Sequence, residues 1–321
     1  MPTIDLGPPR PGPRDLLDGL PRRVSLTLPE LRYAAEAAGG APLPFDLVDL
    51  VDRAGGGDSV LAARLGGAVD ADDAAAYAAA LARLAAPVDT LTRRGLLVAG
   101  ELDRGILGAV GLLATPRFAL DLDVVAGGVQ ARCWHRQSAG AVASLATADG
   151  LVFELAWFPT WAWADELSRV AVIPEDLPLT ESRVPGFVDL PHELADAGVE
   201  AVRSHRADLL PVLAAQHRGR VTDETGDVLT DLEVGTVLTA LASEPQGRLR
   251  AMVADVSGAA AATVGVVAWT LVGDGWRALR PHGVDERLHV EVRRVIPEDL
   301  AADLAPVLAV VTGARPPGPR G

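Results

Sequence analysis

The chain has 321 residues, of which 49% are hydrophobic and 22% are charged, so it is long and apolar enough to bury one large domain or two ordinary ones. It contains no lysine, which excludes P-loop nucleotide sites and Schiff-base enzymes, because both need an ammonium side chain at a fixed place. The formal net charge of −14 argues against nucleic acid as a partner, since the phosphates would be repelled.

Two further features bear on the compartment. The one cysteine, Cys133, cannot form an internal disulfide, which fits a reducing environment. The first residues show no apolar signal-peptide core. The uncharged run from Val256 to Gly273 contains glycines and is flanked by aspartates, so we interpret it as a loop and a buried strand, with no insertion in a membrane. We therefore expect a cytoplasmic protein.

The two ends of the chain are rich in proline. Residues 1–22 and 314–321 carry few side chains that can pack, and we expect both to be disordered tails around a folded part at residues 23–313. Within that part, Arg23 to Leu28 alternates like a strand. Thr27 and Glu30 then form a capping-box pattern that predicts a helix to about Ala38.

Helical and strand signals follow each other twice along the folded part. Residues 70–113 have a helical pattern that is broken at Pro87, and residues 118–158 hold four short alternating or apolar runs with glycine-bearing turns between them. Helical signal returns over residues 190–242, and strand signal returns after it. The pattern predicts an α+β fold with antiparallel meanders.

An exact repeat suggests that the two blocks are related. The six letters from Val172 to Leu177 recur from Val295 to Leu300. We interpret each copy as a strand that leads into a helix, with Pro174 or Pro297 at the first helical position. We therefore predict two structurally related halves, at about residues 70–178 and 190–312, joined about a pseudo-twofold axis.

Few residues offer catalytic chemistry. Asp121 and Asp123 fit the opening motif of haloacid-dehalogenase-like phosphatases, but that family needs a lysine, and strand alternation explains the same letters. Cys133 and His135 stand two apart on a predicted strand, where a buried cysteine is the simpler interpretation. The remaining histidines have no metal-site spacing. We predict no catalytic residue, no metal and no cofactor.

The most unusual local feature is a cluster of four aromatic side chains just after a predicted strand. Rings are preferred anchors of protein interfaces, and four of them so close together cannot easily all face one core. We therefore predict that this cluster binds a partner and that some of its members reach the surface, with core packing as the alternative. The candidate partner-binding residues are Trp157, Phe158, Trp161 and Trp163.

The order of these features resembles the EspG family, the actinobacterial chaperones of type VII (ESX) secretion. The resemblance is carried by LTLPELRYAAEAAG near the start, by LTRRGLLVAGELDRGILGAVGLLATPRFALDLDVV before the first meander, and by WTLVGDGWRALRP before the last strand and helix. It spans residues 23–312.

The resemblance implies a single α+β domain in which helical bundles flank a central antiparallel sheet with quasi-twofold symmetry. It implies no enzymatic activity. It also implies that the sheet and the C-terminal helical bundle bind a helical secreted protein of the PE/PPE or WXG type in the cytosol, keep it soluble and direct it to export. Two alternatives stay open: a hydrolase with a dispersed site that uses Asp121 and Asp123, and a winged-helix regulator, which the acidic charge disfavours.

Overall fold

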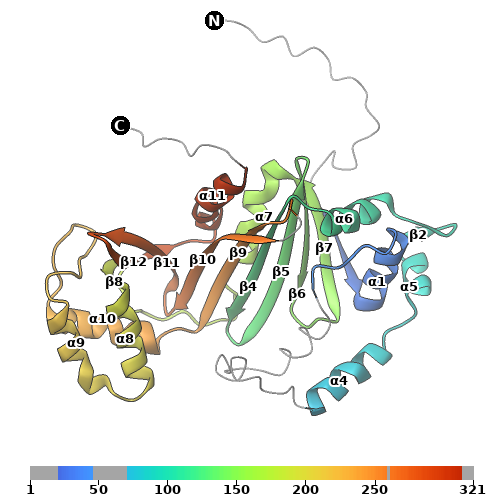
Figure 1. Cartoon of the computed structure of the whole chain (residues 1–321). Coiled ribbons are helices and arrows are strands. Elements are labelled where there is room, and N and C mark those ends of the chain that lie inside the picture. The colour runs from blue at the N-terminus through green and yellow to red at the C-terminus, as the bar shows by residue number, and fades with distance from the viewer. Residues whose placement is uncertain (1–20, 46–70, 259–260, 313–321) are drawn as a thin grey trace, which may run out of the picture.

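The computed structural model describes residues 21–45, 71–258 and 261–312 (Figure 1). The two predicted tails lie outside the described residues, apart from residues 21 and 22. In the parts of the chain that are described, no helix is long and apolar enough to cross a lipid bilayer. The uncharged run that begins at Val256 contains a strand, as expected.

Among the described residues, ten strands form one antiparallel sheet, in the order β1-β7-β6-β5-β4-β9-β10-β11-β12-β8. The predicted fold class, α+β with a central antiparallel sheet, is confirmed. The strands are β1 (Arg22–Thr27), β4 (Phe118–Ala126), β5 (Val129–Ser138), β6 (Ala141–Thr147), β7 (Val152–Pro159), β8 (Phe187–Pro191), β9 (Gly247–Asp255), β10 (Ala262–Val272), β11 (Gly275–Val284) and β12 (Arg287–Val295).

The strand order is symmetric about the pair formed by β4 and β9. In each half a first strand is followed by helices and then by a four-strand meander, and the last strand of the meander pairs with that first strand, β7 with β1 and β12 with β8. The two halves meet where β4 and β9 pair antiparallel, so a pseudo-twofold axis passes between these strands. The first half therefore begins at β1, before the boundary near residue 70 that the repeat suggested.

The helices form two bundles and a separate pair. The bundles hold α1 (Leu28–Ala37), α5 (Pro87–Arg93) and α6 (Arg104–Ala114) in the first half, and α8 (His192–Arg203), α9 (Leu210–Gln216) and α10 (Asp231–Ser243) in the second. Helix α4 (Ala71–Ala82) stands apart from the first bundle (Figure 1). The pair is α7 (Trp163–Val170) and α11 (Asp299–Thr312). Short elements are η1 (Thr160–Ala162), η2 (Ala207–Leu209) and the hairpin β2 (Leu97–Val98) with β3 (Glu101–Leu102). The predicted capping box of Thr27 and Glu30 starts α1.

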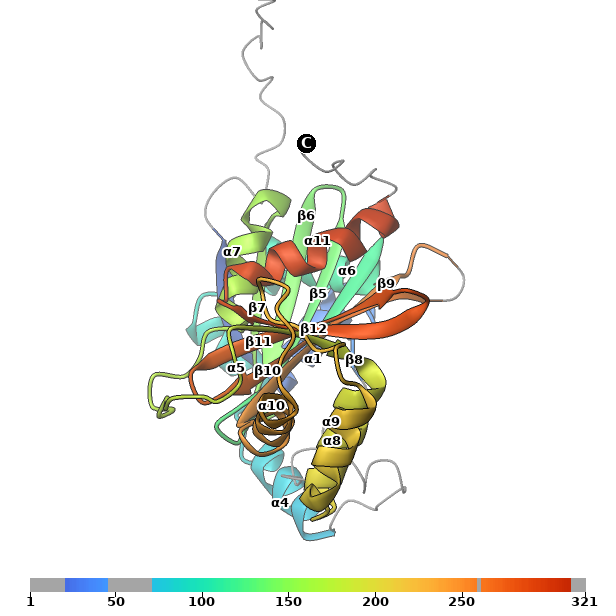
Figure 2. The ribbon, with the colours of Figure 1, turned by 90° about the vertical axis from the view of Figure 1, so that its left-hand side faces the viewer.

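The two faces of the sheet are covered differently (Figure 2). One face, here called the α11 face, buries a core against α7 and α11 that includes Phe158, Trp269 and Leu304. The other, here called the bundle face, buries two separate cores, one under α1 and α6 and one under α8 and α10. The bundles therefore lie at the two ends of the same face and leave its middle between them.

The six-letter repeat does not mark equivalent positions, and this prediction was wrong. Pro297 lies between β12 and α11, in a turn two residues before the helix begins at Asp299, whereas Pro174 lies in a turn after α7 has ended. By topology, the counterpart of Pro297 is Pro159, where β7 leads through η1 into α7. What the two copies share is a leucine directed to the α11-face core, Leu177 partly buried and Leu300 fully buried.

The join between the halves makes a test of the packing. A Cβ atom on Gly247 would lie 2.3 Å from the Val125 carbonyl oxygen, a backbone atom that cannot move aside. We expect Gly247→Ala to lower the free energy of unfolding by about 1–3 kcal/mol through strain. The matched control is Gly235→Ala in α10, where a Cβ atom meets nothing within 4 Å. This substitution should raise the free energy of unfolding by about 0.5–1 kcal/mol. Urea unfolding measures both, and equal effects would contradict the packing at this join.

Candidate partner-binding surface

Strand geometry separates the first two of the four predicted aromatic residues. Trp157 and Phe158 are neighbours on β7, so they point to opposite faces of the sheet. Trp157 packs in the core under α1 and α6, where its ring lies against Gly105, and Phe158 is fully buried in the α11-face core. Both faces of β7 are covered, so neither ring is accessible to a partner.

The third residue, Trp163, is buried because its indole has a specific partner. Its Nε1 donates a hydrogen bond of 2.9 Å to Nδ1 of the buried His135. Since Nδ1 accepts, the neutral ring carries its proton on Nε2, which lies 3.1 Å from the Cys133 sulfur. Burial raises the pKa of the Cys133 thiol, so this thiol stays protonated and unreactive. Cys133 and His135 thus face the same way but form part of a core.

Burial, together with the charge of Arg136, lowers the pKa of His135 to about 3. Below pH 6.5 the unfolded chain binds a proton at this ring that the folded chain does not bind. The stability that the neutral ring contributes is therefore complete above pH 6.5, and it falls toward pH 3 by up to about 1.4 kcal/mol per pH unit. Urea unfolding between pH 7 and 4 measures this slope. We expect the unfolding free energy of His135→Gln to fall less steeply with pH than that of the wild type, and that of His192→Ala to fall as steeply. Equal slopes for all three proteins would contradict the assignment of this pH dependence to His135.

Trp161 is the one member of the aromatic cluster that is exposed, with 73% of its surface accessible. It stands on η1, between the end of β7 and α7. The helix that follows, α7, forms with α11 an apolar groove of about 330 Å³. The groove is lined by Trp163, Ala164, Leu167, Ala301, Ala305, Leu308 and Ala309.

The middle of the bundle face is a second candidate surface. There β4, β9 and β10 carry charged and half-exposed side chains in place of the buried apolar residues found on the same face at both ends. We call these side chains the central face. They are Asp121, Asp123, Arg248, Arg250, Met252 and Val266.

Two apolar side chains lie in the middle of the central face. Met252 is 39% exposed and stands opposite Val266, which is 42% exposed. On the other side, Met252 stands opposite Asp121. Alternation in the segment RLRAMVADV predicts that Arg248, Arg250 and Met252 share a face, but only the tertiary fold shows that this face is open.

A hollow of about 590 Å³ borders the central face on the side of the first bundle. Its walls come from residues 42–44, from the end of α6 and from the starts of β4 and the loop after β9. Ala119 and Arg136, which line it, stand on the same face as Asp121. The central face is therefore a mainly polar surface with an apolar middle and a recess at one side.

Asp121 and Asp123 both lie on this surface and are held by cations. Asp121 pairs with Arg136 at 2.6 Å, and Asp123 accepts a hydrogen bond from Gln130 at 2.8 Å and lies 3.6 Å from Arg248. The ion pairs account for both residues as cross-strand partners on an open sheet face.

Comparison with solved structures gives the fold a known counterpart. The chain is similar to EspG5, the Mycobacterium tuberculosis type VII secretion system chaperone, in its complex with the PE25–PPE41 dimer. The alignment covers 90% of this chain and 96% of that chain, with a TM-score of 0.54 and 9% sequence identity. No protein-family model and no curated protein matches the sequence. The predicted resemblance to the EspG family is thus confirmed at the level of the fold.

Proposed function

We propose that this chain is a non-enzymatic chaperone of a type VII secretion system. In this proposal it binds a helical protein of the PE/PPE or WXG type in the cytoplasm, keeps it soluble and directs it to export. The observation that carries the proposal is the fold, since the likeness to a chaperone solved with a PE–PPE dimer extends over nearly all of both chains. The central ion pairs of Asp121 and Asp123 give no support to the hydrolase alternative.

We assign the main client contact to the central face. The apolar pair Met252 and Val266 can contact the apolar tip of a client helix. The charged residues around the pair can form ion pairs with polar side chains of the client, and protein interfaces commonly have such an apolar centre and polar rim. The resemblance implies contacts from the sheet and the C-terminal helical bundle. The central face belongs to the sheet, and it borders the bundle of α8, α9 and α10 (Figure 1), so a client seated on it would also lie next to that bundle.

Trp161 is proposed as a second, separate contact. Of the four aromatic residues that the sequence singled out, it is the one whose ring a partner can reach. It stands on η1, just before α7, which with α11 covers the side of the sheet opposite to the central face. A client that used both sites would have to reach around the edge of the sheet, so the two contacts can be tested independently.

Co-expression tests the proposal. The chain is produced together with each small helical PE-, PPE- or WXG-type protein encoded beside its gene, with an affinity tag on the candidate client. We expect one of these clients to be insoluble alone and to co-purify with this chain at a fixed ratio as a soluble complex. If every such client is soluble alone and none co-purifies, the proposed function is wrong.

A further inference from the structure

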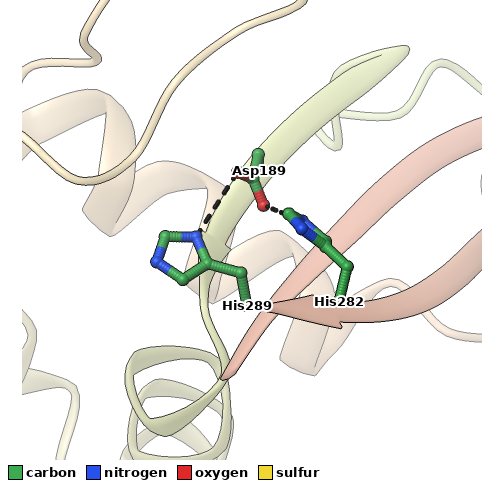
Figure 3. Close-up of side chains that lie close together, drawn as sticks. All are labelled: Asp189, His282 and His289. Atoms are coloured by element: carbon green, nitrogen blue, oxygen red, sulfur yellow. Dashed lines mark hydrogen bonds and ion pairs between the residues drawn. The ribbon is translucent and has the colours of Figure 1, made fainter. Parts of the chain in front are cut away.

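Three side chains with metal-ligand chemistry converge at the outer end of the second half of the sheet (Figure 3). They are Asp189 on β8, His282 on β11 and His289 on β12, and one nitrogen or oxygen atom from each lies within 4.8 Å of the others. The cluster is separate from the central face, since these three side chains stand on the α11 face near the edge strand β8.

Strand register brings the three together. His282 and His289 are direct partners in the pairing of β11 with β12, so their rings lie side by side on one face, with centroids 5.9 Å apart. Asp189 pairs with Glu291, two residues along β12 from His289, so it points to the same face and lies diagonal to His289. The backbone of Asp189 is fixed on its other side by hydrogen bonds with Thr222.

The carboxylate stands between the two rings. One Asp189 oxygen lies 2.9 Å from His282 Nε2, and the other lies 3.3 Å from His289 Nδ1. The His289 side chain is only 8% exposed, and its Nδ1, although it points at Asp189, has no partner in hydrogen-bond geometry within the described chain. A buried ring nitrogen of this kind costs free energy unless something satisfies it.

We propose that Asp189, His282 and His289 bind one divalent transition-metal cation, with Zn²⁺ as the best fit. Two imidazoles and one carboxylate are a common set of protein ligands for Zn²⁺, and a solvent molecule completes the coordination. Ligand bonds of about 2.0–2.2 Å place the donor atoms of a tetrahedral site roughly 3.3 Å apart, close to the two nitrogen–oxygen distances in this cluster. Bound metal also satisfies the buried Nδ1 of His289.

The surroundings permit a cation to enter and to stay. His282 is 40% exposed and Asp189 is 19% exposed, so one side of the cluster is open to solvent. Glu291, which stands opposite Asp189, pairs with Arg280 and Arg293 at 3.0 Å. These two arginines also pair with Asp303 and Glu224, which leaves Asp189 to balance the metal charge. Such a site would tie the edge strand β8 to the hairpin of β11 and β12 and so anchor the strand that leads into α8.

Zinc titration of the full chain tests the site. The protein is freed of any histidine tag, treated with a chelator and titrated with ZnCl₂ by calorimetry, and its melting temperature is followed with and without Zn²⁺. We expect one Zn²⁺ per chain with micromolar or tighter affinity and a higher melting temperature. Loss of a residue that only hydrogen-bonds to a ligand weakens metal sites by roughly 10–100-fold, so His282→Ala, which removes a ligand itself, should weaken binding by more than about 100-fold.

A second histidine–carboxylate pair gives a matched control. His192 and Asp196 lie 3.2 Å apart on α8, and within the described ranges no further ligand residue forms a cluster with them, so His192→Ala should bind Zn²⁺ like the wild type. Circular dichroism checks that each variant folds, and Asp189→Asn replaces His282→Ala if the latter does not. The proposal is overturned if the wild type takes up no Zn²⁺, or if the ligand variant that folds binds it as tightly as His192→Ala.

Discussion

Replacing Phe158 by alanine is expected to lower the free energy of unfolding by about 3–5 kcal/mol, while replacing Trp161 by alanine should change it by less than about 0.5 kcal/mol. The two residues are three apart in the sequence, yet Phe158 is fully buried in the α11-face core and Trp161 is 73% exposed. Because small domains are stable by only about 5–15 kcal/mol, the first change removes a large share of the total.

Trp163→Ala should be at least as damaging as Phe158→Ala. It opens a cavity in the same core and also leaves Nδ1 of the buried His135 without its donor. Urea unfolding followed by circular dichroism measures all three variants, and Trp161→Ala serves as the exposed control. If Trp161→Ala unfolded the protein as readily as Phe158→Ala, the division of the cluster into core and surface would be wrong.

The aromatic cluster shows what the sequence could and could not predict. Adjacent residues on a strand point to opposite faces, so the neighbours Trp157 and Phe158 could be assigned to two different environments from sequence alone. That both environments are buried depends on α6 covering one face of β7 and α7 with α11 covering the other. Contacts of this kind join distant segments and leave no local pattern.

The eight meander strands were predictable for the opposite reason. Their alternation is local, and glycine-bearing turns between them fix the antiparallel order of neighbours. Strand β8 is not predicted, because it is only five residues long, from Phe187 to Pro191, and runs directly into a helix, so that its last two residues fall in the segment predicted to be helical. Local sequence patterns also cannot predict that the two meanders join in one sheet, since this depends on the pairing of β4 with β9.

The repeated hexapeptide illustrates the limit of local identity. Pro174 and Pro297 have the same five neighbours within the repeat, but β7 passes into α7 before the first copy begins, and Pro178 follows soon after that copy. The preceding element, a helix in one case and a strand in the other, decides whether the segment can start a helix. The predicted symmetry was right, although the residues chosen to support it were not equivalent.

The candidate ligand cluster could not be found from spacing. Asp189 lies far from His282 and His289 in the sequence, and the two histidines are separated by the turn of a hairpin. Known zinc signatures rely on ligands at short fixed intervals along one element. In this chain the three residues are brought together by the register of the paired strands, which includes the pairing of β8 with β12, and not by a fixed interval along the sequence.

Changing the central face should have the largest effect on client binding. We expect Met252→Arg to weaken binding by about 30-fold or more, because truncation or replacement of a central apolar anchor commonly costs 2 kcal/mol or more. Arginine is chosen because Asp121 stands directly opposite Met252, so the new charge has a cross-strand partner and the fold should be retained. The melting temperature should therefore change little, since Met252 is already 39% exposed.

The control for this change is Val98→Arg, which places the same charge on a side chain that is 65% exposed in the small hairpin of β2 and β3. Calorimetric titration with the co-purified client compares Met252→Arg, Val98→Arg and Trp161→Ala with the wild type. Loss of affinity in Met252→Arg assigns the main client contact to the central face, because a charge introduced where an apolar helix tip docks must be desolvated when the client binds. A loss in Trp161→Ala as well supports the second contact at Trp161, and unchanged affinity in that variant rules the second contact out. Loss in Trp161→Ala alone would assign the client to the region of α7 and would contradict the central-face assignment.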